Sequence, residues 1–398
     1  MNKKKIIFSI LISIAAISAQ ATEGINLIGV GPVQQGTAGA GVASAKDSTW
    51  LILNPAGLTD TKLGLDTSIQ YFAPRRTINS TLSGGAGKQK DTSAFFIPSI
   101  SATLGCCNDG KGFFGFGIYG TSGMGVDYSK GRIGADTNSD MMPDTPQGQV
   151  DTMTELAIAK MTFTYAHKFD NGFSIGAGPI FVLSRLKTDM ISSINVPQSG
   201  DWDEAVGLGA IIGVNQKITD RLTIGASYMS EQYMTEFDEY DDLLDDSMNL
   251  PQQVTIGLAY NILTNLEAVL DYRWVGWSHL DTLGDQFGWE DQNIVKAGLT
   301  WGATDHLTLR GGISHGNSPI DSSSAFGNAL FPAIMETHLS CGASYQFENF
   351  ALHFAFTHAL EEDITANGKD AGPMGPLARG TEISMSQNSA TIGVSWKF

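Results

Sequence analysis

The chain has 398 residues, of which 46 are glycine, and its 41 acidic side chains outnumber its 24 basic ones. The net charge is -17, yet only 16% of the residues are charged and 42% are hydrophobic, which excludes a disordered acidic chain. A chain this acidic repels phosphate backbones, so a nucleic-acid-binding protein is excluded as well. Beyond the first 20 residues no apolar run is long enough for a membrane-spanning helix. The glycine content instead favours an all-β chain.

The first 21 residues have the pattern of a secretory signal peptide. Three lysines at positions 3–5 precede the apolar run 6–16, and a small-residue cleavage site follows at 19–21. The alternatives are a buried helix or a membrane anchor, but the run is too short to span a bilayer. Cleavage would remove three lysines and give the mature chain a net charge of -17 - 3 = -20.

The three cysteines, at positions 106, 107 and 341, have no metal-binding spacing. Cys341 lies in an apolar alternating segment, where cysteine behaves as a small hydrophobic residue. We interpret all three as structural or incidental, and the redox state of the adjacent Cys106 and Cys107 stays open in an oxidising compartment.

From residue 63 onward, apolar and polar residues alternate with a period of two, which is typical of β-strands. The pattern is clearest in residues 389–398, where the even positions are apolar and the odd positions are small or polar. In a soluble sandwich the apolar face would cover a core, whereas in an outer-membrane barrel it faces lipid. The terminal Phe398 resembles the assembly signal of bacterial outer-membrane barrels, so we expect the barrel-assembly machinery as a partner.

The predicted connections alternate between short and long without a break. The short turns are expected at 106–112, 170–172, 219–221, 263–265, 303–306 and 348–350, and the long loops near 79–91, 127–151, 189–201, 238–250, 278–292, 316–332 and 361–385. Thirteen connections imply fourteen strands, and short turns on one side with long loops on the other are typical of outer-membrane barrels. The sequence therefore predicts one 14-stranded antiparallel transmembrane β-barrel over residues 63–398.

Residues 22–62 do not alternate and are rich in small side chains. They include apolar residues such as Val30, Val42 and Trp50, which a flexible linker does not need. The alternative to a flexible extension is a segment that folds inside the lumen, since a fourteen-strand barrel is wide enough to need a plug or to conduct water.

This segment resembles the N-terminal hatch of the FadL/TodX family, which are outer-membrane transporters of long-chain fatty acids and other hydrophobic compounds. The resemblance rests on Gln34-Gln35-Gly36-Thr37-Ala38-Gly39-Ala40-Gly41, Ala45-Lys46-Asp47 and Asn54-Pro55-Ala56-Gly57-Leu58. Residues 250–254, Trp274, Trp277, the Phe331-Pro332 pair, Gly342 and Tyr345 agree with the central region and late strands of the family. The resemblance implies a barrel whose hatch, residues 22–62, gates the lumen.

The resemblance also implies a kink in the third strand that opens a lateral gap. Residues 112–125 contain repeated glycines, and glycine inside a strand marks bends and broken pairing. We assign the kink to Gly117, Gly120 and Gly123. The alternative is a strand that is simply rich in glycine.

A fatty acid needs an apolar groove for its tail and cations or hydrogen-bond donors for its carboxylate. The period-two pattern places Lys160, Arg273, Lys296 and Arg310 on the lumen face, together with His338 and His353. We predict a carboxylate-binding patch of Arg310, His338 and His353 on three consecutive strands. The alternative is ordinary pairing with lumen acids such as Glu267 and Asp271.

The outer loop 238–250 is the candidate capture site. Leu243, Leu244 and Met248 are predicted to share a short helix face, although six acids in this loop make a solvated acidic loop an equal alternative. Residues 136–140 match only the start of a calcium loop, because the glycine and the closing glutamate are missing, and no metal site is predicted.

We therefore expect a monomeric outer-membrane protein of Gram-negative bacteria that passively admits hydrophobic solutes without a cofactor. No nucleophile elbow or metal pair is present in the sequence, so an enzyme is not expected. Outer-membrane lipid and lipopolysaccharide are expected partners, and nucleic acid is not. The alternatives are a structural or adhesive barrel and a general porin.

Overall fold

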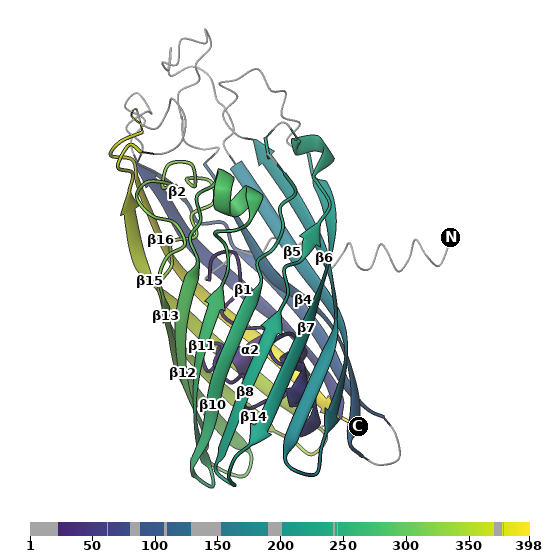
Figure 1. Cartoon of the computed structure of the whole chain (residues 1–398). Helices are drawn as coiled ribbons and strands as arrows, with labels where there is room; N and C mark the ends of the chain where they lie inside the picture. The colour runs from purple at the N-terminus through teal and green to yellow at the C-terminus, as the bar shows by residue number, and fades with distance from the viewer. Residues whose placement is uncertain are drawn as a thin grey trace, which may run out of the picture.

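The computed structural model describes residues 23–61, 63–79, 88–106, 110–128, 153–189, 201–241, 243–244, 246–369, 376 and 378–398. These residues form one antiparallel sheet that closes on itself around an N-terminal segment (Figure 1). Among them, no helix is long and apolar enough to cross a membrane.

Fourteen strands build the wall of the barrel, and each one pairs with its neighbours in chain order. They are β1 (Gly64–Asn79), β3 (Phe95–Cys106), β4 (Gly112–Asp127), β5 (Met153–Lys168), β6 (Phe173–Asp189), β7 (Asp203–Lys217), β8 (Leu222–Met229), β10 (Gln253–Leu263), β11 (Leu266–Val275), β12 (Gln292–Gly302), β13 (Leu307–Gly316), β14 (Thr337–Gln346), β15 (Phe350–Thr365) and β16 (Glu382–Lys397). β16 pairs with β1 along the full length of both strands and closes the barrel. The predicted fourteen-strand barrel is confirmed.

Two short strands extend the wall at its outer end. β2 (Lys88–Asp91) pairs with β1, and β9 (Tyr233–Met234) pairs with β7. The sequence did not predict either strand, because four and two residues are too few to show a period. All six short turns and all seven long loops connect wall strands as expected, with the short turns at the lower end of Figure 1.

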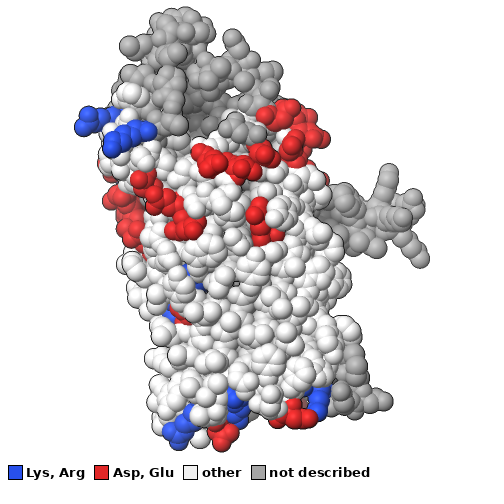
Figure 2. Space-filling view, in the orientation of Figure 1, with Lys and Arg blue, Asp and Glu red and all other residues white. Residues whose placement is uncertain are grey.

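The two faces of the wall follow the alternation of the sequence. On β5, Phe163 and Tyr165 are exposed, while Thr162 and Thr164, which alternate with them along the strand, are buried. Aromatic side chains near the strand ends, such as Trp301, Tyr345 and Trp396, are also exposed on the outside. Figure 2 shows a broad, largely uncharged belt with mostly acidic and a few basic side chains above it and charges of both signs below it. An apolar belt flanked by aromatic residues is the lipid-facing surface of an outer-membrane barrel.

The N-terminal segment, defined here as residues 23–61, lies inside the barrel. It contains the helix α2 (Gly31–Gln35) and two short 3-10 helices, η1 (Ser48–Ile52) and η2 (Pro55–Asp60). Asp47 caps η1 by accepting a hydrogen bond from the Thr49 amide, and Asn54 caps η2 by accepting one from the Ala56 amide. Nearly all of the segment is buried although most of it is irregular, so the wall must supply many of its partners.

Glycines of the wall make room for this segment. A Cβ at Gly176 would lie 2.6 Å from the carbonyl carbon of Pro55, and a Cβ at Gly225 would lie 2.8 Å from the Cα of Ala43. Gly115, Gly213, Gly298, Gly312, Gly342 and Gly393 face other residues of the segment in the same way. Much of the excess glycine in the sequence therefore lies where strand backbone meets the N-terminal segment.

The outer loops between β8 and β10, β11 and β12, and β13 and β14 carry an apolar cluster. Trp277 and Trp289 pack edge to face at 4.9 Å between ring centroids, and Phe287 packs on Phe331 at 5.3 Å. The loop after β11 contains a short π-helix, η4 (Asp281–Gln286). These loops therefore fold as a packed layer over the outer end of the barrel.

Candidate transport site

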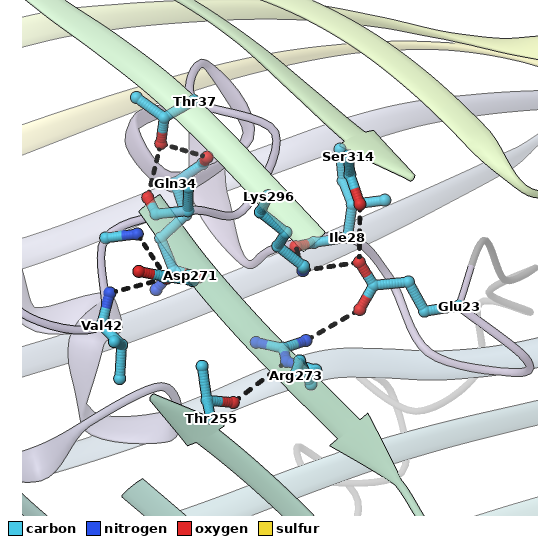
Figure 3. Close-up of polar contacts among 12 residues, drawn as sticks. Glu23, Ile28, Gln34, Thr37, Val42, Thr255, Asp271, Arg273, Lys296 and Ser314 are labelled. Atoms are coloured by element: carbon cyan, nitrogen blue, oxygen red, sulfur yellow. Dashed lines mark hydrogen bonds and ion pairs between the residues drawn. The ribbon is translucent and has the colours of Figure 1, made fainter. Parts of the chain in front are cut away.

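The start of the N-terminal segment is held by a buried group of charges (Figure 3). The carboxylate of Glu23 lies 2.5 Å from Lys296 Nζ on β12 and 2.9 Å from a terminal nitrogen of Arg273 on β11. Burial alone would raise the pKa of Glu23, but Lys296 and Arg273 outweigh burial and lower it below 4.5. Lys296 also donates to the carbonyl of Ile28 at 3.0 Å, so one wall lysine holds two points of the segment.

Wall carboxylates hold the middle of the segment. Asp271 on β11 accepts hydrogen bonds from the amides of Gly41 at 2.7 Å and Val42 at 2.9 Å. Glu267 on the same strand pairs with Lys46 at 2.8 Å. The alternative, in which Asp271 and Glu267 pair with the lumen cations Arg310, His338 and His353, is not what the structure has, because both acids bind the N-terminal segment.

Lys160 on β5 lines a cavity of about 50 Å³ between the N-terminal segment and the wall. The side chain is 2% exposed, and the nearest partner of its ammonium is the sulfur of Met229 at 3.7 Å. Within the described part of the chain no carboxylate forms an ion pair with Lys160. The cavity is lined by Asn26, Leu27, Gly29, Val30, Gln34, Ile52, Leu53, Thr121, Lys160, Met229, Gln253 and Arg273. A buried ammonium beside Arg273 makes this a cationic cavity whose walls are partly polar and partly apolar.

Arg310, His338 and His353 all face the lumen, but the prediction that they form one patch is wrong. Ser344 on β14 accepts a hydrogen bond from Arg310 at 2.6 Å and lies 2.7 Å from Nδ1 of His353. His338 lies on the same strand as Ser344 but six residues away, which is about 20 Å along a strand. The period of two gives the face of a residue, but the register between strands decides its depth in the barrel.

Arg310 and His353 belong to a chain of hydrogen bonds that runs across five strands. His353 Nε2 lies 2.8 Å from the hydroxyl of Ser395 on β16, which donates to Asp66 on β1. Asp66 in turn accepts from the amide of Ser48 at 2.8 Å, so the chain ends on η1 of the N-terminal segment. This network anchors η1 to β1 and gives the segment a second attachment to the wall besides the Glu23 group. His338 is buried near Glu23 and Lys296, and neither ring nitrogen has a hydrogen-bond partner among the described residues.

The residues that resemble the family hatch mark the turns and caps of the segment. Gly39 and Gly41 have φ of 76° and 131°, which glycine adopts readily, while Gly36 has an ordinary φ of -60° at the end of α2. The side chain of Asn54 donates to the carbonyl of Val42 and to the side chain of Asn215 on β7, both at 2.8 Å. Pro55 begins η2, where the N–H group that proline lacks would have no acceptor within the helix. Ala56 and Gly57, which follow it, are buried.

The candidate kink on β4 coincides with a break in the wall. The pairing between β3 and β4 runs from Cys106 opposite Gly112 to Ser99 opposite Tyr119 and stops there. Pairing of β4 with β5 shifts register between Gly120 and Ser122 and then continues to Asp127. The ladder between β3 and β4 therefore ends at Tyr119, while β4 beyond it stays paired with β5.

The N-terminal segment takes the place of the missing pairing on the lumen side. The amide of Leu27 donates to the carbonyl of Thr121 at 2.9 Å, and the amide of Gly123 donates to the carbonyl of Ile25 at 3.0 Å. A Cβ at Gly120 would lie 2.5 Å from a methyl group of Ile97 on β3. Gly120 thus lets Ile97 fill the break, while Gly117 leaves room for the side chain of Tyr119.

Among the described residues of the outer loop after β8 there is one short 3-10 turn, η3 (Asp238–Tyr240), while positions 242 and 245 lie outside the described residues. Leu243 and Leu244 both donate their amides to the carbonyl of Tyr240 at 3.0 Å, as a turn and not as a continuing helix. Leu244 and Met248 are buried in the apolar layer of the outer loops, and Leu243 packs against it.

Several sequence predictions fall outside the described residues. The expected signal peptide at 1–21, Cys107 and the partial calcium loop at 136–140 lie there, and the side chain of Cys106 is not described. Cys341 on β14 is exposed on the outer face. Among the described residues, no group of three or more His, Cys, Asp and Glu side chains is arranged to hold a metal ion.

Sequence reasoning missed Glu23 and the role of Asp271. Glu23 is the only acidic residue between positions 22 and 46, and a lone acid in a segment of small residues is a signal for a buried ion pair. Its partners on β11 and β12 lie some 250 residues away in the chain, and spacing cannot reveal that distance.

The barrel, its apolar belt and the plugged lumen together define an outer-membrane transport protein. The sequence model of the family described as outer membrane protein transport protein (OMPP1/FadL/TodX) matches residues 12–398, so the chain belongs to this family. The members of this family are transport channels for hydrophobic compounds, and the protein is a transporter of the outer membrane and not an enzyme.

Solved structures agree on the fold at low sequence identity. The toluene transporter TodX of P. putida is 17% identical with a TM-score of 0.74, and the match covers 93% of this chain and 99% of that one. A FadL homologue of Pseudomonas aeruginosa is 15% identical with a TM-score of 0.69, covering 94% and 100%. The toluene transporter TbuX of Ralstonia pickettii is 17% identical with a TM-score of 0.64, covering 93% and 98%. No curated protein matches the sequence.

Proposed function

We propose that this transporter takes up long-chain fatty acids or similar hydrophobic compounds that carry a carboxylate. The observation that supports this is Lys160, a buried ammonium without a carboxylate partner among the described residues, beside Arg273 in a cavity with mixed polar and apolar walls. A desolvated cation favours an anionic partner, and the apolar part of the lining, Leu27, Val30, Ile52, Leu53 and Met229, offers contact to a hydrocarbon chain.

The N-terminal segment acts as a hatch in this proposal. The cavity of about 50 Å³ holds a few water molecules but is smaller than the roughly 150 Å³ needed to admit a benzene ring. A solute therefore enters only if residues of the segment move. The lining residues that belong to the segment are Asn26, Leu27, Gly29, Val30, Gln34, Ile52 and Leu53. The carboxylate of Glu23, held by Lys296 and Arg273, occupies the kind of site that a solute carboxylate would compete for.

Lateral release between β3 and β4 is the second part of the proposal. The ladder between β3 and β4 ends at Tyr119, and beyond it Ile97 and the backbone bonds of Ile25 and Leu27 contribute to closure of the wall. Side-chain packing and two hydrogen bonds cost less to open than a strand ladder. The apolar side chains at the break suit an apolar solute that leaves into lipid.

The head-group site is tested with Lys160→Met and with Lys168→Met as the matched control. Lys168 lies on the same strand but pairs with Asp60 at 2.5 Å near the lower end of the barrel, where both groups are exposed. A hydrogen bond to a charged group contributes about 1.5–3 kcal/mol, so Lys160→Met is expected to reduce oleate uptake in proteoliposomes about tenfold or more. Equal oleate uptake by the two variants would reject the head-group site.

The lateral exit is tested with a disulfide between Ile97→Cys and Gly120→Cys in a background without the native cysteines. A Cβ at position 120 would lie 3.8 Å from Cβ of Ile97, within the usual range of about 3.5–4.5 Å for a disulfide. The oxidised variant is expected to lose uptake and to regain it after reduction. Full uptake in the oxidised state would reject this exit.

A second candidate solute class is the neutral monoaromatic hydrocarbon, because TodX and TbuX are named as toluene transporters. Toluene has no carboxylate, so Lys160→Met is expected to leave toluene entry unchanged if the protein accepts it. Toluene entry without any oleate uptake in the unmodified protein would favour this second class. Steady ion conductance in planar bilayers would instead favour a general porin, and the filled lumen argues against it.

A further inference from the structure

Three basic side chains gather on the outward face of the wall at the outer end of β1 and β2 (Figure 1). On β2, Lys88 and Lys90 are exposed and alternate with buried residues. On β1, Arg75 is exposed and precedes the buried Arg76. Because Arg76 pairs with the buried Asp91 on the inner face of the same two strands, the three exposed side chains point to the outside.

The register between the two strands brings these cations close together. Lys90 lies opposite Thr77 and Lys88 lies opposite Asn79, so Arg75 is a diagonal neighbour of Lys90. Diagonal neighbours on one face of a sheet are about 7–8 Å apart. Within the described part of the chain, no carboxylate forms an ion pair with any of the three, which are called the β1–β2 cations below.

Cations on another part of the outward face have carboxylates beside them. On β6, Arg185 forms an ion pair of 3.2 Å with Glu204 on β7, and its guanidinium lies 4.8 Å from the ring centre of Trp202. Lys187 on the same strand lies directly opposite Glu155 on β5. Like charges that lie close together repel one another, so the β1–β2 cations favour an anionic partner from outside the chain.

An apolar surface lies on the same face, nearer the middle of the barrel. Tyr71 on β1 and Phe96 on β3 are exposed, with 5.5 Å between their ring centroids, and Ile69 lies beside them opposite Ile392 of β16. Arg75 follows Tyr71 by four residues, which is roughly 13 Å along a strand. Aromatic residues at the edge of the apolar belt lie at the level of the lipid headgroups. The β1–β2 cations therefore lie at the depth of headgroups, next to a surface that suits acyl chains.

We propose that the β1–β2 cations form a docking surface for lipopolysaccharide, the phosphorylated glycolipid of the outer leaflet. Guanidinium and ammonium groups bind phosphate through charge-assisted hydrogen bonds, while Tyr71 and Phe96 contact the acyl chains. The cations extend over roughly 13 Å along the strands, from Arg75 to the position of Lys88 opposite Asn79. A lipid with one phosphate occupies only part of this surface, whereas a headgroup with phosphates on two sugars spans it.

The test compares two double variants that remove the same charge. Arg75→Gln with Lys90→Gln removes the diagonal pair, and Arg185→Gln with Lys187→Gln is the matched control near the outer end of β6. Fluorescently labelled rough lipopolysaccharide is titrated into the purified protein in detergent, with EDTA present to remove divalent cations. The retention of heat-modifiable gel mobility shows that each barrel is folded.

The β1–β2 variant is expected to bind this lipopolysaccharide about tenfold more weakly than the parent or worse, because each basic residue near an anionic lipid surface adds to the affinity. The control is expected to bind as the parent does. Lipopolysaccharide from which the phosphates have been removed is expected to bind the parent as weakly as the intact lipid binds the β1–β2 variant.

Equal affinity of the parent and the β1–β2 variant would overturn the proposal. An equal loss of affinity in the control would also overturn it, because the response would then follow net charge and not position. Binding by the parent that disappears in EDTA would assign the contact to bridging divalent cations in place of these side chains. Phosphatidylglycerol that binds the parent as tightly as lipopolysaccharide does would reject lipopolysaccharide as the specific occupant.

Discussion

The carboxylate of Asp271 on the barrel wall accepts a hydrogen bond of 2.7 Å from the backbone amide of Gly41 in the N-terminal segment. The same oxygen accepts from the amide of Val42, while Glu23 reaches in the opposite direction, from the segment to wall cations. The segment is thus held through complementary charge and amide contacts on one side of the lumen. Such contacts are directional, so they fix the position of the segment more strictly than apolar packing does.

The first prediction concerns the acceptor at position 271. Asp271→Ala removes both hydrogen bonds, and because each buried amide left unpaired costs about 1–3 kcal/mol, the segment is expected to loosen and ion conductance in planar bilayers to rise. Asp271→Asn keeps one carbonyl oxygen that can accept both bonds and is expected to conduct as little as the parent. Equal conductance of the two variants would show that the amide contacts do not hold the segment.

The second prediction compares two glycines of the same motif. Gly39 has φ of 76°, and a Cβ there would collide with the backbone of Ile28 and lie 2.9 Å from Lys296 Nζ. Gly39→Ala is expected to displace the segment and to make it sensitive to protease in folded barrels. Gly36→Ala is the control, because its φ of -60° is ordinary and its Cβ would lie 3.2 Å from the flexible side chain of Arg310. Equal protection of both variants would contradict the prediction.

The third prediction is a pH window for the attachment of the segment. Burial and the neighbouring Asp66 raise the pKa of Asp47 to about 7 from an ordinary 3.8. A raised pKa gives a contribution to stability that is complete below pH 3.8 and is lost as the pH rises through about 7. The lowered pKa of Glu23 gives the opposite sign, a contribution present above pH 4.5 and lost as the pH falls through the value in the folded protein.

The segment is therefore expected to resist protease best near pH 4.5 and to become more sensitive as the pH rises from there to about 7. Asp47→Asn is expected to remove this weakening and to leave the acid side unchanged. Proteolysis of the segment at about pH 5 and about pH 8 in parent and variant checks this. A variant that still weakens between these two pH values would assign the titration to another group.

The fourth prediction concerns the hydroxyl of Ser344, which links Arg310 with His353. Ser344→Ala is expected to lower the free energy of unfolding of the barrel by about 1–3 kcal/mol, measured in urea with lipid vesicles, because two buried groups lose a partner. Ser340 on the same strand is the matched control, since its hydroxyl has no hydrogen-bond partner among the described residues. Its change to alanine is expected to be nearly neutral, and equal losses at both positions would contradict a special role for the chain of hydrogen bonds.

The sequence alone determines the barrel well, because the period of two and the alternation of short and long connections are both local signals. The faces of Lys160, Lys296 and Arg310 follow directly from that period. Depth in the barrel is not local: it depends on strand register, which sets His338 about 20 Å from Ser344 and so away from His353. The pairing of Glu23 with Arg273 and Lys296 depends on where an irregular segment settles inside the barrel, for which the sequence carries no periodic signal.

The contacts of the N-terminal segment with both early and late strands have a consequence for assembly in the membrane. The helix α2 packs against β1, β14, β15 and β16, which include the last strands of the chain, while η2 packs against β4, β5, β6 and β7. The residues of α2 therefore cannot reach their final contacts until the last strands have joined β1. Folding of the segment and closure of the barrel are therefore coupled. A misplaced segment would impair the pairing of β1 with β16 that closes the barrel.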